Sequence, residues 1–288
     1  MGFSVVIPCY NEEKSIRAIL TAMVSDLEKY KVPYEIIVVD DCSSDGTREE
    51  ILALGLKVTL IEHRRNLGYG AALKSGIKNS AYDLIVITDA DGTYPNSKIP
   101  ALVSVAKKEN WDMVVGARTG QNVNIPLVRK PAKWFISRLA NFLCGTNIPD
   151  LNSGLRVMKK EVVERFLHIL PEGFSFTSTI TLAMLTNGYT VQYTSIDYFK
   201  REGKSKIHPV KDTLNFIQLI IRTVLYFNPL KVFIPFSFFL ILLAVAVFIG
   251  SWLLLGKAMD VTFGVILMTS VIVLAIGMLA DLIDKRVP

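Results

Sequence analysis

Residues 84–92 read Leu-Ile-Val-Ile-Thr-Asp-Ala-Asp-Gly, an apolar β-branched run that leads directly into two carboxylates. The run has the composition of a buried strand, and Asp89 and Asp91 stand where that strand ends. Two carboxylates at such a strand end can converge on one hard divalent ion, with water and phosphate oxygens completing its shell. A solvated acidic turn is the alternative, but the buried strand before the pair favours a metal site.

Strands and helices alternate on both sides of this segment. Four further short β-branched runs are typical of strands: 3–7, 34–39, 57–61 and 113–116. Helix-like stretches lie between the strands: 12–29, 47–54, 68–80 and 97–109. This repetition predicts an α/β domain with a mostly parallel sheet, whose ligands bind at the carboxyl ends of the strands.

Polar segments rich in carboxylates or glycine follow four of the predicted strands, at residues 8–12, 40–47, 89–92 and 117–118. Asp40 and Asp41 end the second strand, where a carboxylate can accept hydrogen bonds from a ribose hydroxyl or a base N–H. Asp45 and Thr47 also fit a turn and a helix N-cap. We therefore expect ligand binding by Asp41 and turn formation by Asp45 and Thr47.

The composition of the 288 residues, 51% hydrophobic and 20% charged, excludes a disordered chain, and three cysteines exclude a disulfide scaffold. Residues 232–288 carry three basic and three acidic side chains, so the whole net charge of +6 lies in residues 1–231. A basic domain suits an anionic partner such as phosphate or an acidic membrane. Nucleic acid is not expected, because the sequence has no aromatic-interleaved basic motif and no helix-turn-helix pattern.

Two long apolar runs end the chain. Residues 232–255 would span about 36 Å as a helix and residues 261–280 about 30 Å, against a hydrocarbon core of about 30 Å. These lengths predict a transmembrane hairpin with spans at about 232–255 and 261–281; a buried helical hairpin of a soluble core is the alternative. Residues 207–230 carry apolar side chains at helical spacing and predict one or two amphipathic helices at the bilayer surface.

Basic residues near the ends of the spans predict the orientation. Lys211, Arg222 and Lys231 precede the first span and Lys285 and Arg286 follow the second, whereas the short loop between the spans has only Lys257. Both termini and the N-terminal domain should therefore be cytoplasmic. The expected organisation is a catalytic domain at 1–206, juxtamembrane helices at 207–230 and the hairpin at 231–288. It would lie in a cell membrane, or in the endoplasmic reticulum if the organism is eukaryotic.

The site segments together resemble the family-2 glycosyltransferases, which have the GT-A fold. The resemblance rests on residues 5–12 (Val-Val-Ile-Pro-Cys-Tyr-Asn-Glu), 38–41 with 43–47, and 88–91. Within that family the chain is most similar to the polyprenyl-phosphate glycosyltransferases, among them dolichol-phosphate mannose synthase and bacterial glucosyl and aminoarabinosyl relatives. That closer match rests on the two spans and on four segments: 116–118, 129–133, 150–156 and 201–206.

The resemblance implies a role for each matched residue. The implied nucleotide-binding residues are Pro8, Tyr10, Glu12, Asp40, Asp41 and Asp89. Asp89 and Asp91 would hold Mg²⁺ or Mn²⁺ against the diphosphate. Some relatives add a glutamine ligand where this chain has Thr93, so a third protein ligand is not implied. The implied acceptor-phosphate residues are Arg118, Arg129 and Lys133. Arg201 and Lys206 would neutralise the leaving diphosphate, and they complete the implied catalytic set with Asp89, Asp91 and Arg118.

The implied reaction is inverting transfer of a hexose from a nucleotide sugar, with UDP-hexose favoured, to undecaprenyl or dolichyl phosphate. A homo-oligomer is left open. The main alternative is a GDP-mannose-dependent dolichol-phosphate mannose synthase. A processive polysaccharide synthase normally carries Gln/Arg-x-x-Arg-Trp, but residues 218–223 have the wrong spacing and no tryptophan. A hydroxyl acceptor would need a base, and residues 174–178 lack the acid that many such relatives carry. A non-catalytic membrane-anchored sensor of nucleotide sugars is the remaining alternative.

Overall fold

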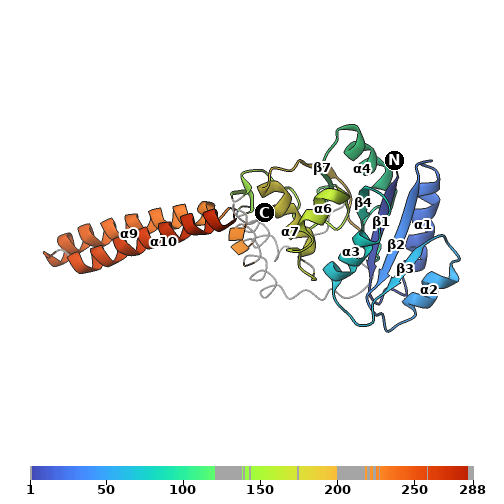
Figure 1. Ribbon diagram of the computed structural model, residues 1–288, viewed down its shortest axis with the longest axis horizontal. Helices are drawn as coiled ribbons and strands as arrows, with labels where there is room; N and C mark the ends of the chain where they lie inside the picture. The colour runs from blue at the N-terminus through green and yellow to red at the C-terminus, as the bar shows by residue number, and fades with distance from the viewer. Residues whose placement is uncertain are drawn as a thin grey trace.

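A computed structural model of the chain describes residues 2–120, 138, 140–142, 144–173, 175–199, 218, 221–222, 225–226, 228–257 and 259–284. In these ranges a seven-stranded sheet has the order β3-β2-β1-β4-β6-β5-β7 (Figure 1). The strands are β1 Phe3–Cys9, β2 Tyr34–Asp40, β3 Thr59–Glu62, β4 Leu84–Ile87, β5 Met113–Ala117, β6 Arg156–Lys159 and β7 Val191–Ser195. The five predicted strands are all present, and β6 and β7 are additional.

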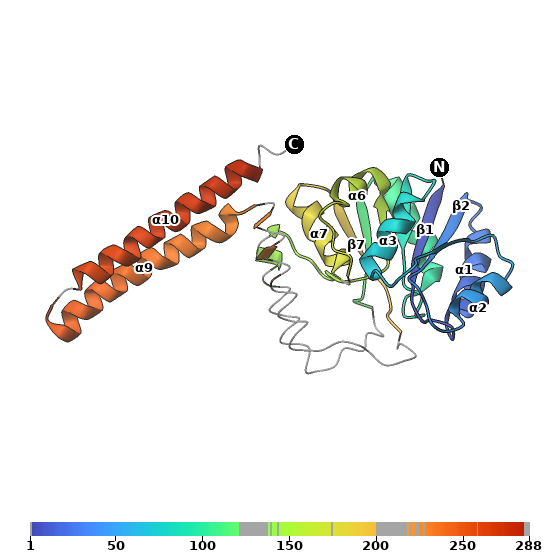
Figure 2. The same cartoon turned by 60° about the horizontal axis from the view of Figure 1, so that its bottom comes forward.

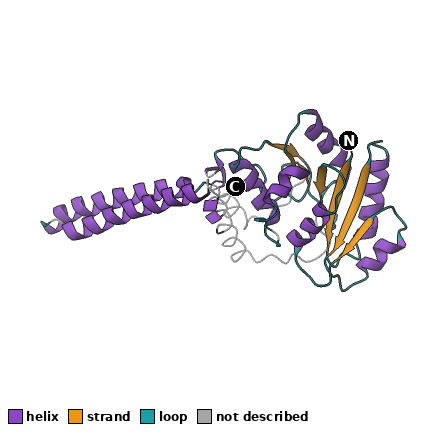
Figure 3. Ribbon diagram, in the orientation of Figure 1, coloured by secondary structure: helices purple, strands orange, loops and turns teal. Residues whose placement is uncertain are grey.

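The sheet is parallel except at one strand. β1 pairs in parallel with β2 and β4, β2 with β3, and β5 with β7, whereas β6 runs antiparallel to both β4 and β5. β5 therefore runs in the same direction as β4. The carboxyl ends of six strands and the amino end of β6 consequently lie along one edge of the sheet, which we call the carboxyl edge (Figure 3). The predicted mostly parallel sheet is confirmed.

Helices cover both faces of the sheet. Among the described residues, the α-helices of the domain with defined bounds are α1 Ile16–Glu28, α2 Thr47–Ala53, α3 Tyr69–Lys78, α4 Ile99–Lys108, α6 Lys160–Phe166 and α7 Phe176–Thr186. Val5 and Ile7 of β1 are buried against α1, α2 and α4, while Val6 is buried against α3, α6 and α7. This period of two puts alternate strand residues into two apolar cores, which gives the domain three layers.

The first helix begins later than predicted, at Ile16 rather than at residue 12. The intervening loop is tied to the loop after β2: the amide of Glu12 donates to Thr47 Oγ1 at 2.8 Å, and Asn11 Oδ1 accepts from the amide of Ser44 at 2.8 Å. Asn11 has a φ of 57°, which a helix does not allow. Residues 12–15 still form a turn, in which the carbonyl of Glu12 accepts from the amides of Ser15 and Ile16, so the difference from the prediction is confined to the start of the helix.

Two long helices, α9 Leu230–Leu255 and α10 Asp260–Asp284, form an antiparallel hairpin that extends away from the domain (Figure 2). Their apolar parts, Leu230–Leu254 and Asp260–Ile283, have mean hydropathies of 2.9 and 2.5 and are long enough to span a membrane. Only 11% of each apolar window is buried within the chain. The core of a soluble protein would bury most of such helices, so this exposure argues against the soluble-core alternative.

Small polar side chains join the two long helices. Ser237 Oγ donates to the carbonyl of Ser270, and Ser270 Oγ donates to the carbonyl of Ser237, each at 3.0 Å. Such hydrogen bonds and close packing are the usual ways in which apolar helices associate in lipid. At its base the hairpin packs against the domain, where Val232 contacts an apolar cluster that includes Leu151 and Leu182.

Candidate active site

The two carboxylates that follow β4 are each held by a protein hydroxyl. Tyr69 donates its hydroxyl hydrogen to Asp89 Oδ1 at 2.9 Å. Thr93 donates its hydroxyl hydrogen to Asp91 Oδ1 at 2.6 Å and its backbone amide to the same oxygen at 3.1 Å. Thr93 is fully buried and its hydroxyl donates to Asp91. We therefore do not expect Thr93 to be a metal ligand in place of the glutamine of some relatives.

The donor set around Asp89 suits a hard divalent ion. The side chains of Asp89 and Asp91 both offer carboxylate oxygens, the ligand type that Mg²⁺ and Mn²⁺ prefer. The backbone of Gly154 passes so close that a Cβ there would lie 2.8 Å from Asp89 Oδ2. Among the residues that the structure describes, no three His, Cys, Asp or Glu side chains form a metal-binding group. Asp89 and Asp91 would therefore share a bound ion with the substrate's oxygens.

The close approach of Gly154 gives a testable prediction. Gly154→Ala would push a methyl group against the Asp89 carboxylate, so we expect at least about a tenfold loss of the sugar transfer that the resemblance implies, since small misplacements at reacting groups are costly. Initial rates measured over a metal titration check this. Gly173→Ala is the matched control, because nothing lies within 4 Å of a Cβ there. An unchanged rate and metal dependence for Gly154→Ala would contradict the expectation.

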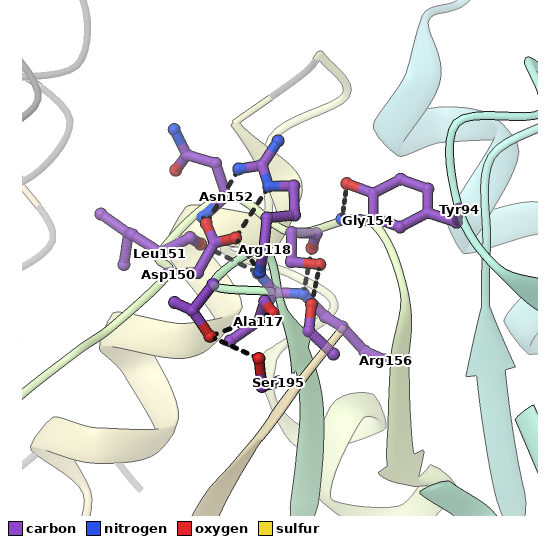
Figure 4. Close-up of polar contacts among 12 residues, drawn as sticks. Tyr94, Ala117, Arg118, Asp150, Leu151, Asn152, Gly154, Arg156 and Ser195 are labelled. Atoms are coloured by element: carbon purple, nitrogen blue, oxygen red, sulfur yellow. Dashed lines mark hydrogen bonds and ion pairs between the residues drawn. The ribbon is translucent and has the colours of Figure 1, made fainter. Parts of the chain in front are cut away.

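Arg118, directly after β5, forms a bidentate ion pair with Asp150 (Figure 4). Its Nε and Nη2 donate to the two carboxylate oxygens at 2.7 and 2.8 Å, and its backbone amide donates to Oδ2 at 2.9 Å. The guanidinium also stacks over the ring of Tyr198 at 5.1 Å. Asp150 uses two of the five N–H donors of the guanidinium. A contact between Arg118 and an acceptor phosphate stays a prediction.

The electrostatics of this pair follow from its burial. Burial alone would raise the pKa of Asp150, but the hydrogen bonds and positive charge of Arg118 outweigh it and lower the pKa. Burial alone would likewise lower the pKa of Arg118, but the bonds to Asp150 raise it. Both side chains are therefore charged at neutral pH, and the pair fixes the guanidinium at the carboxyl edge.

Arg156, the first residue of β6, shapes the loop that carries Asp150 (Figure 4). The side chain is fully buried, with Nε donating to the carbonyl of Ser153 at 2.6 Å and Nη2 to the carbonyl of Leu151 at 2.9 Å. Its Nη1 donates to Thr181 Oγ1 on α7. Burial lowers the pKa of Arg156, and the nearby Tyr193 and Asp150 oppose that effect. Residues 150–155 are thus folded around a buried guanidinium.

Asp41 has an internal role in the structure. Its Oδ1 accepts from the amide of Leu67 at 2.9 Å and lies 2.6 Å from His63 Nδ1, while its Oδ2 accepts from the amide of Gly68 at 2.7 Å. The other ring nitrogen of His63 lies 2.8 Å from Ser75 Oγ. Asp41 thereby ties the ends of β2 and β3 to the start of α3. Nucleoside binding by Asp41 stays a prediction, and it would use the lone pairs that these contacts leave.

The other predicted nucleotide-binding residues lie along the same edge. Asp40 Oδ1 accepts from the amide and hydroxyl of Ser43, which shapes the loop after β2. Pro8 is buried within β1, Tyr10 is exposed, and Glu12 Oε2 accepts from Ser15 Oγ at 3.0 Å. The contacts of Asp45 with Thr47 confirm the predicted turn, but the predicted N-cap is wrong, because Gly46 is the N-cap of α2 and no side chain caps it.

The remaining predicted side chains have no placement to compare. Arg129, Lys133, Arg201 and Lys206 lie outside the described residues, as does most of the predicted interface segment 207–230. Sequence reasoning gave no role at the site to Tyr69, Asp150 and Arg156, and it interpreted His63 only as a structural or surface residue. In the sequence, Tyr69 is marked only by the glycines on either side of it, and Asp150 and Arg156 only by the family resemblance of segment 150–156. Their hydrogen-bond partners lie far away in the sequence.

Comparison with known proteins finds curated relatives of part of the chain. Undecaprenyl-phosphate 4-deoxy-4-formamido-L-arabinose transferase of Yersinia enterocolitica is 34% identical over 169 residues, which are 57% of this chain and 51% of that protein. The enzyme of the same name from Serratia proteamaculans is 33% identical over 169 residues, which are again 57% of this chain and 51% of that protein. The chain thus spans about half the length of these curated relatives.

Solved structures show the fold. Glucosyl-3-phosphoglycerate synthase from Mycobacterium tuberculosis in complex with UDP superposes with a TM-score of 0.60 at 18% identity, covering 77% of this chain and 80% of that one. Its complex with Mn²⁺, UDP and phosphoglyceric acid gives the same TM-score and identity and covers 77% and 78%. At this identity the likeness shows the GT-A fold alone. Residues 4–167, more than half of the chain, match the family described as glycosyl transferase family 2, and the chain therefore belongs to that family.

Proposed function

We propose that the protein transfers a sugar from a nucleotide sugar to a polyprenyl phosphate at the cytoplasmic face of a membrane. One observation carries the proposal: the carboxylates Asp89 and Asp91 and the cation Arg118 lie at one edge of a sheet, in a chain that continues into two membrane-length helices. The curated relatives are named as undecaprenyl-phosphate transferases, which supports this acceptor class. UDP in the structural neighbours supports a UDP sugar as donor, and we favour a UDP-hexose.

The donor side of the proposed site comprises the loops after β1, β2 and β4. A divalent ion, Mg²⁺ or Mn²⁺, held by Asp89 and Asp91 would supply positive charge against the donor diphosphate. The linked loops at residues 10–15 and 43–47 form the adjoining part of the carboxyl edge, where the nucleoside would bind. Pro8, Tyr10, Glu12, Asp40 and Asp41 belong to these segments or directly precede them. Arg201 and Lys206 would neutralise the charge that develops on the leaving diphosphate.

The acceptor needs no strong base in this reaction. A phosphate monoester has a second pKa near 6, so it is largely dianionic at pH 7. One of its oxygens forms the new bond to the anomeric carbon, and the bond to the donor diphosphate breaks with its electron pair on the diphosphate. A single displacement of this kind inverts the anomeric centre. The first turn of α7 carries no acidic residue, and Ser178 there donates to Asn152, which favours phosphate over a hydroxyl acceptor.

Positive charge on the acceptor side would orient the lipid phosphate. Arg118 is fixed by Asp150 and Tyr198, so its guanidinium is preorganised and need not be ordered by the substrate. Arg129 and Lys133 would add charge from the segment that follows β5 in the sequence. The hairpin α9–α10 would hold this side beside the bilayer, with both termini cytoplasmic, and residues 1–206 would form the catalytic domain.

A donor screen tests the proposal. The full chain, purified in detergent, is incubated with Mn²⁺, native polyprenyl lipid extract and one nucleotide sugar at a time, including UDP-glucose, GDP-mannose and the formamido-arabinose donor. We expect mass spectrometry to detect a lipid phosphate that carries one sugar, made from a UDP sugar. A product from GDP-mannose alone would favour the mannose synthase alternative. Nucleotide binding without any transfer would overturn the proposal in favour of a sensor.

A further inference from the structure

The hydroxyl of Tyr69 has no part in the chemistry described so far, yet it contacts a carboxylate at the centre of the site. We propose that Tyr69 is a positioning residue, whose hydroxyl fixes the orientation of the Asp89 carboxylate for metal binding. The contact is direct, with Tyr69 Oη 2.9 Å from Asp89 Oδ1. This inference rests on the proposed function, because it takes Asp89 to be a metal ligand.

The backbone around Tyr69 is held on both sides. The amide of Gly68 donates to Asp41 Oδ2 at 2.7 Å, and the amide of Gly70 donates to the carbonyl of Glu172 at 2.6 Å. A Cβ on Gly70 would lie 2.1 Å from the carbonyl oxygen of Pro171, so only glycine permits this approach. The ring of Tyr69 packs against the apolar core under α3. The start of α3 is therefore a rigid base from which the phenol reaches Asp89.

The chemistry of the pair suits a positioning role. The phenol O–H of Tyr69 is a hydrogen-bond donor, and the ionised carboxylate of Asp89 can only accept, so the direction of the hydrogen bond is fixed. A carboxylate that accepts this hydrogen bond at Oδ1 has lost much of its freedom to rotate. Hydrogen bonds of this kind, from groups behind the ligands, commonly orient metal-binding side chains and tune their affinity.

Asp91 offers an internal comparison. Its Oδ1 accepts from the Thr93 hydroxyl and also from the Thr93 backbone amide. Thr93→Val keeps the shape of the side chain and the backbone donor, whereas Tyr69→Phe removes the phenolic donor completely. The loss of the Tyr69 hydroxyl should therefore weaken metal binding more than the loss of the Thr93 hydroxyl.

Mn²⁺ binding to the full chain in detergent tests the inference. The probe is Mn²⁺ alone, followed by the decrease of the electron paramagnetic resonance signal of the free ion. We expect Tyr69→Phe to weaken Mn²⁺ binding about tenfold, in the range found for groups that support metal ligands. Because the protein's fold is unchanged, transfer should recover towards the wild-type rate when Mn²⁺ is saturating. Thermal unfolding of each variant checks that the fold is intact.

Two controls separate failure of the inference from failure of the proposed function. Tyr189→Phe removes a phenol that accepts from Arg165 at the opposite edge of the sheet, and it should leave Mn²⁺ binding unchanged. Asp89→Asn should abolish binding. If Asp89→Asn abolishes binding but Tyr69→Phe matches the wild type, the positioning role is wrong and the metal site stands. If Asp89→Asn also matches the wild type, the metal site and the positioning role both fail.

Discussion

Replacing Asp91 with asparagine should abolish sugar transfer while the domain stays folded. The amide oxygen of asparagine can still accept from the Thr93 hydroxyl and amide, so the loop after β4 keeps its hydrogen bonds. What is lost is one of two negative charges that would hold the metal. Metal stabilisation of a transition state supplies several kcal/mol, which corresponds to a loss of about 10³-fold or more. Initial rates with a labelled nucleotide sugar measure the loss.

A carboxylate at the other edge of the sheet is the matched control for Asp91→Asn. Asp112 precedes β5 and bonds to Thr190 and Lys159, far along the strand from the site. Asp112→Asn also removes one negative charge, but it should leave transfer unchanged. Wild-type turnover by Asp91→Asn, or wild-type activity that persists in EDTA, would refute metal dependence.

Breaking the Arg118–Asp150 pair should have the largest effect on stability. Only 3% of the Asp150 side chain and 22% of the Arg118 side chain is exposed. Asp150→Ala leaves the guanidinium buried without its carboxylate, which typically costs about 3–5 kcal/mol. The apparent unfolding midpoint of the full chain in detergent should fall by about 10 °C, using the usual scaling for a domain of this size. Transfer should also fall by about 10²-fold, because Arg118 is no longer held in place.

A double-mutant cycle isolates this interaction. Arg118→Ala with Asp150→Ala removes both charges, so the double variant should be less destabilised than the sum of the single variants. If the loss of stability in the double variant equals the sum of the losses in the two single variants, the two side chains have no interaction energy and the expectation is wrong.

Acid should weaken the same pair. The pKa of Asp150 lies below its ordinary value of 3.8 in the folded chain, so its contribution to stability is present at neutral pH. That contribution to stability is lost as the pH falls below the pKa of Asp150 in the unfolded chain and towards its lower pKa in the folded chain. The stability difference between the wild type and Asp150→Asn should therefore shrink on acidification. A difference that stays constant between pH 7 and pH 3 would contradict the assigned pKa shift.

The parallel part of the fold could be predicted from the sequence because its strands are apolar and β-branched. Segments 5–7 and 85–87, for example, consist only of valine and isoleucine, residue types that are usually buried, and all six side chains are fully buried in the structure. β6 and β7 escaped prediction because they carry polar residues, and not because of their length, which matches that of β3, β4 and β5. β6 begins and ends with basic side chains, and Arg156 is buried there only because distant carbonyls accept its hydrogen bonds. The pattern of residues within β6 cannot predict these hydrogen bonds, because the carbonyls that accept them lie outside the strand.

The site could be predicted only in part, for a related reason. Asp89, Asp91 and Arg118 follow recognisable strands, so their position at one edge follows from the order of the elements. The roles of Tyr69 and Gly154 depend on contacts with residues that are distant in the sequence, namely Asp89 for both. Such contacts arise from how α3 and the loop before β6 pack, which the local sequence pattern does not encode.

The antiparallel strand β6 has a consequence for how this enzyme family can diversify. It lies between β4 and β5, so under the proposed function it would separate the strands whose loops bind the donor from the strand whose loop binds the acceptor. The loop before β6 reaches Asp89 on one side through Gly154 and Arg118 on the other through Asp150. Under the proposed function, this one loop would therefore couple the metal-binding half of the site to the acceptor half. A change of acceptor would then preserve the donor chemistry only where this loop keeps both Gly154 and Asp150.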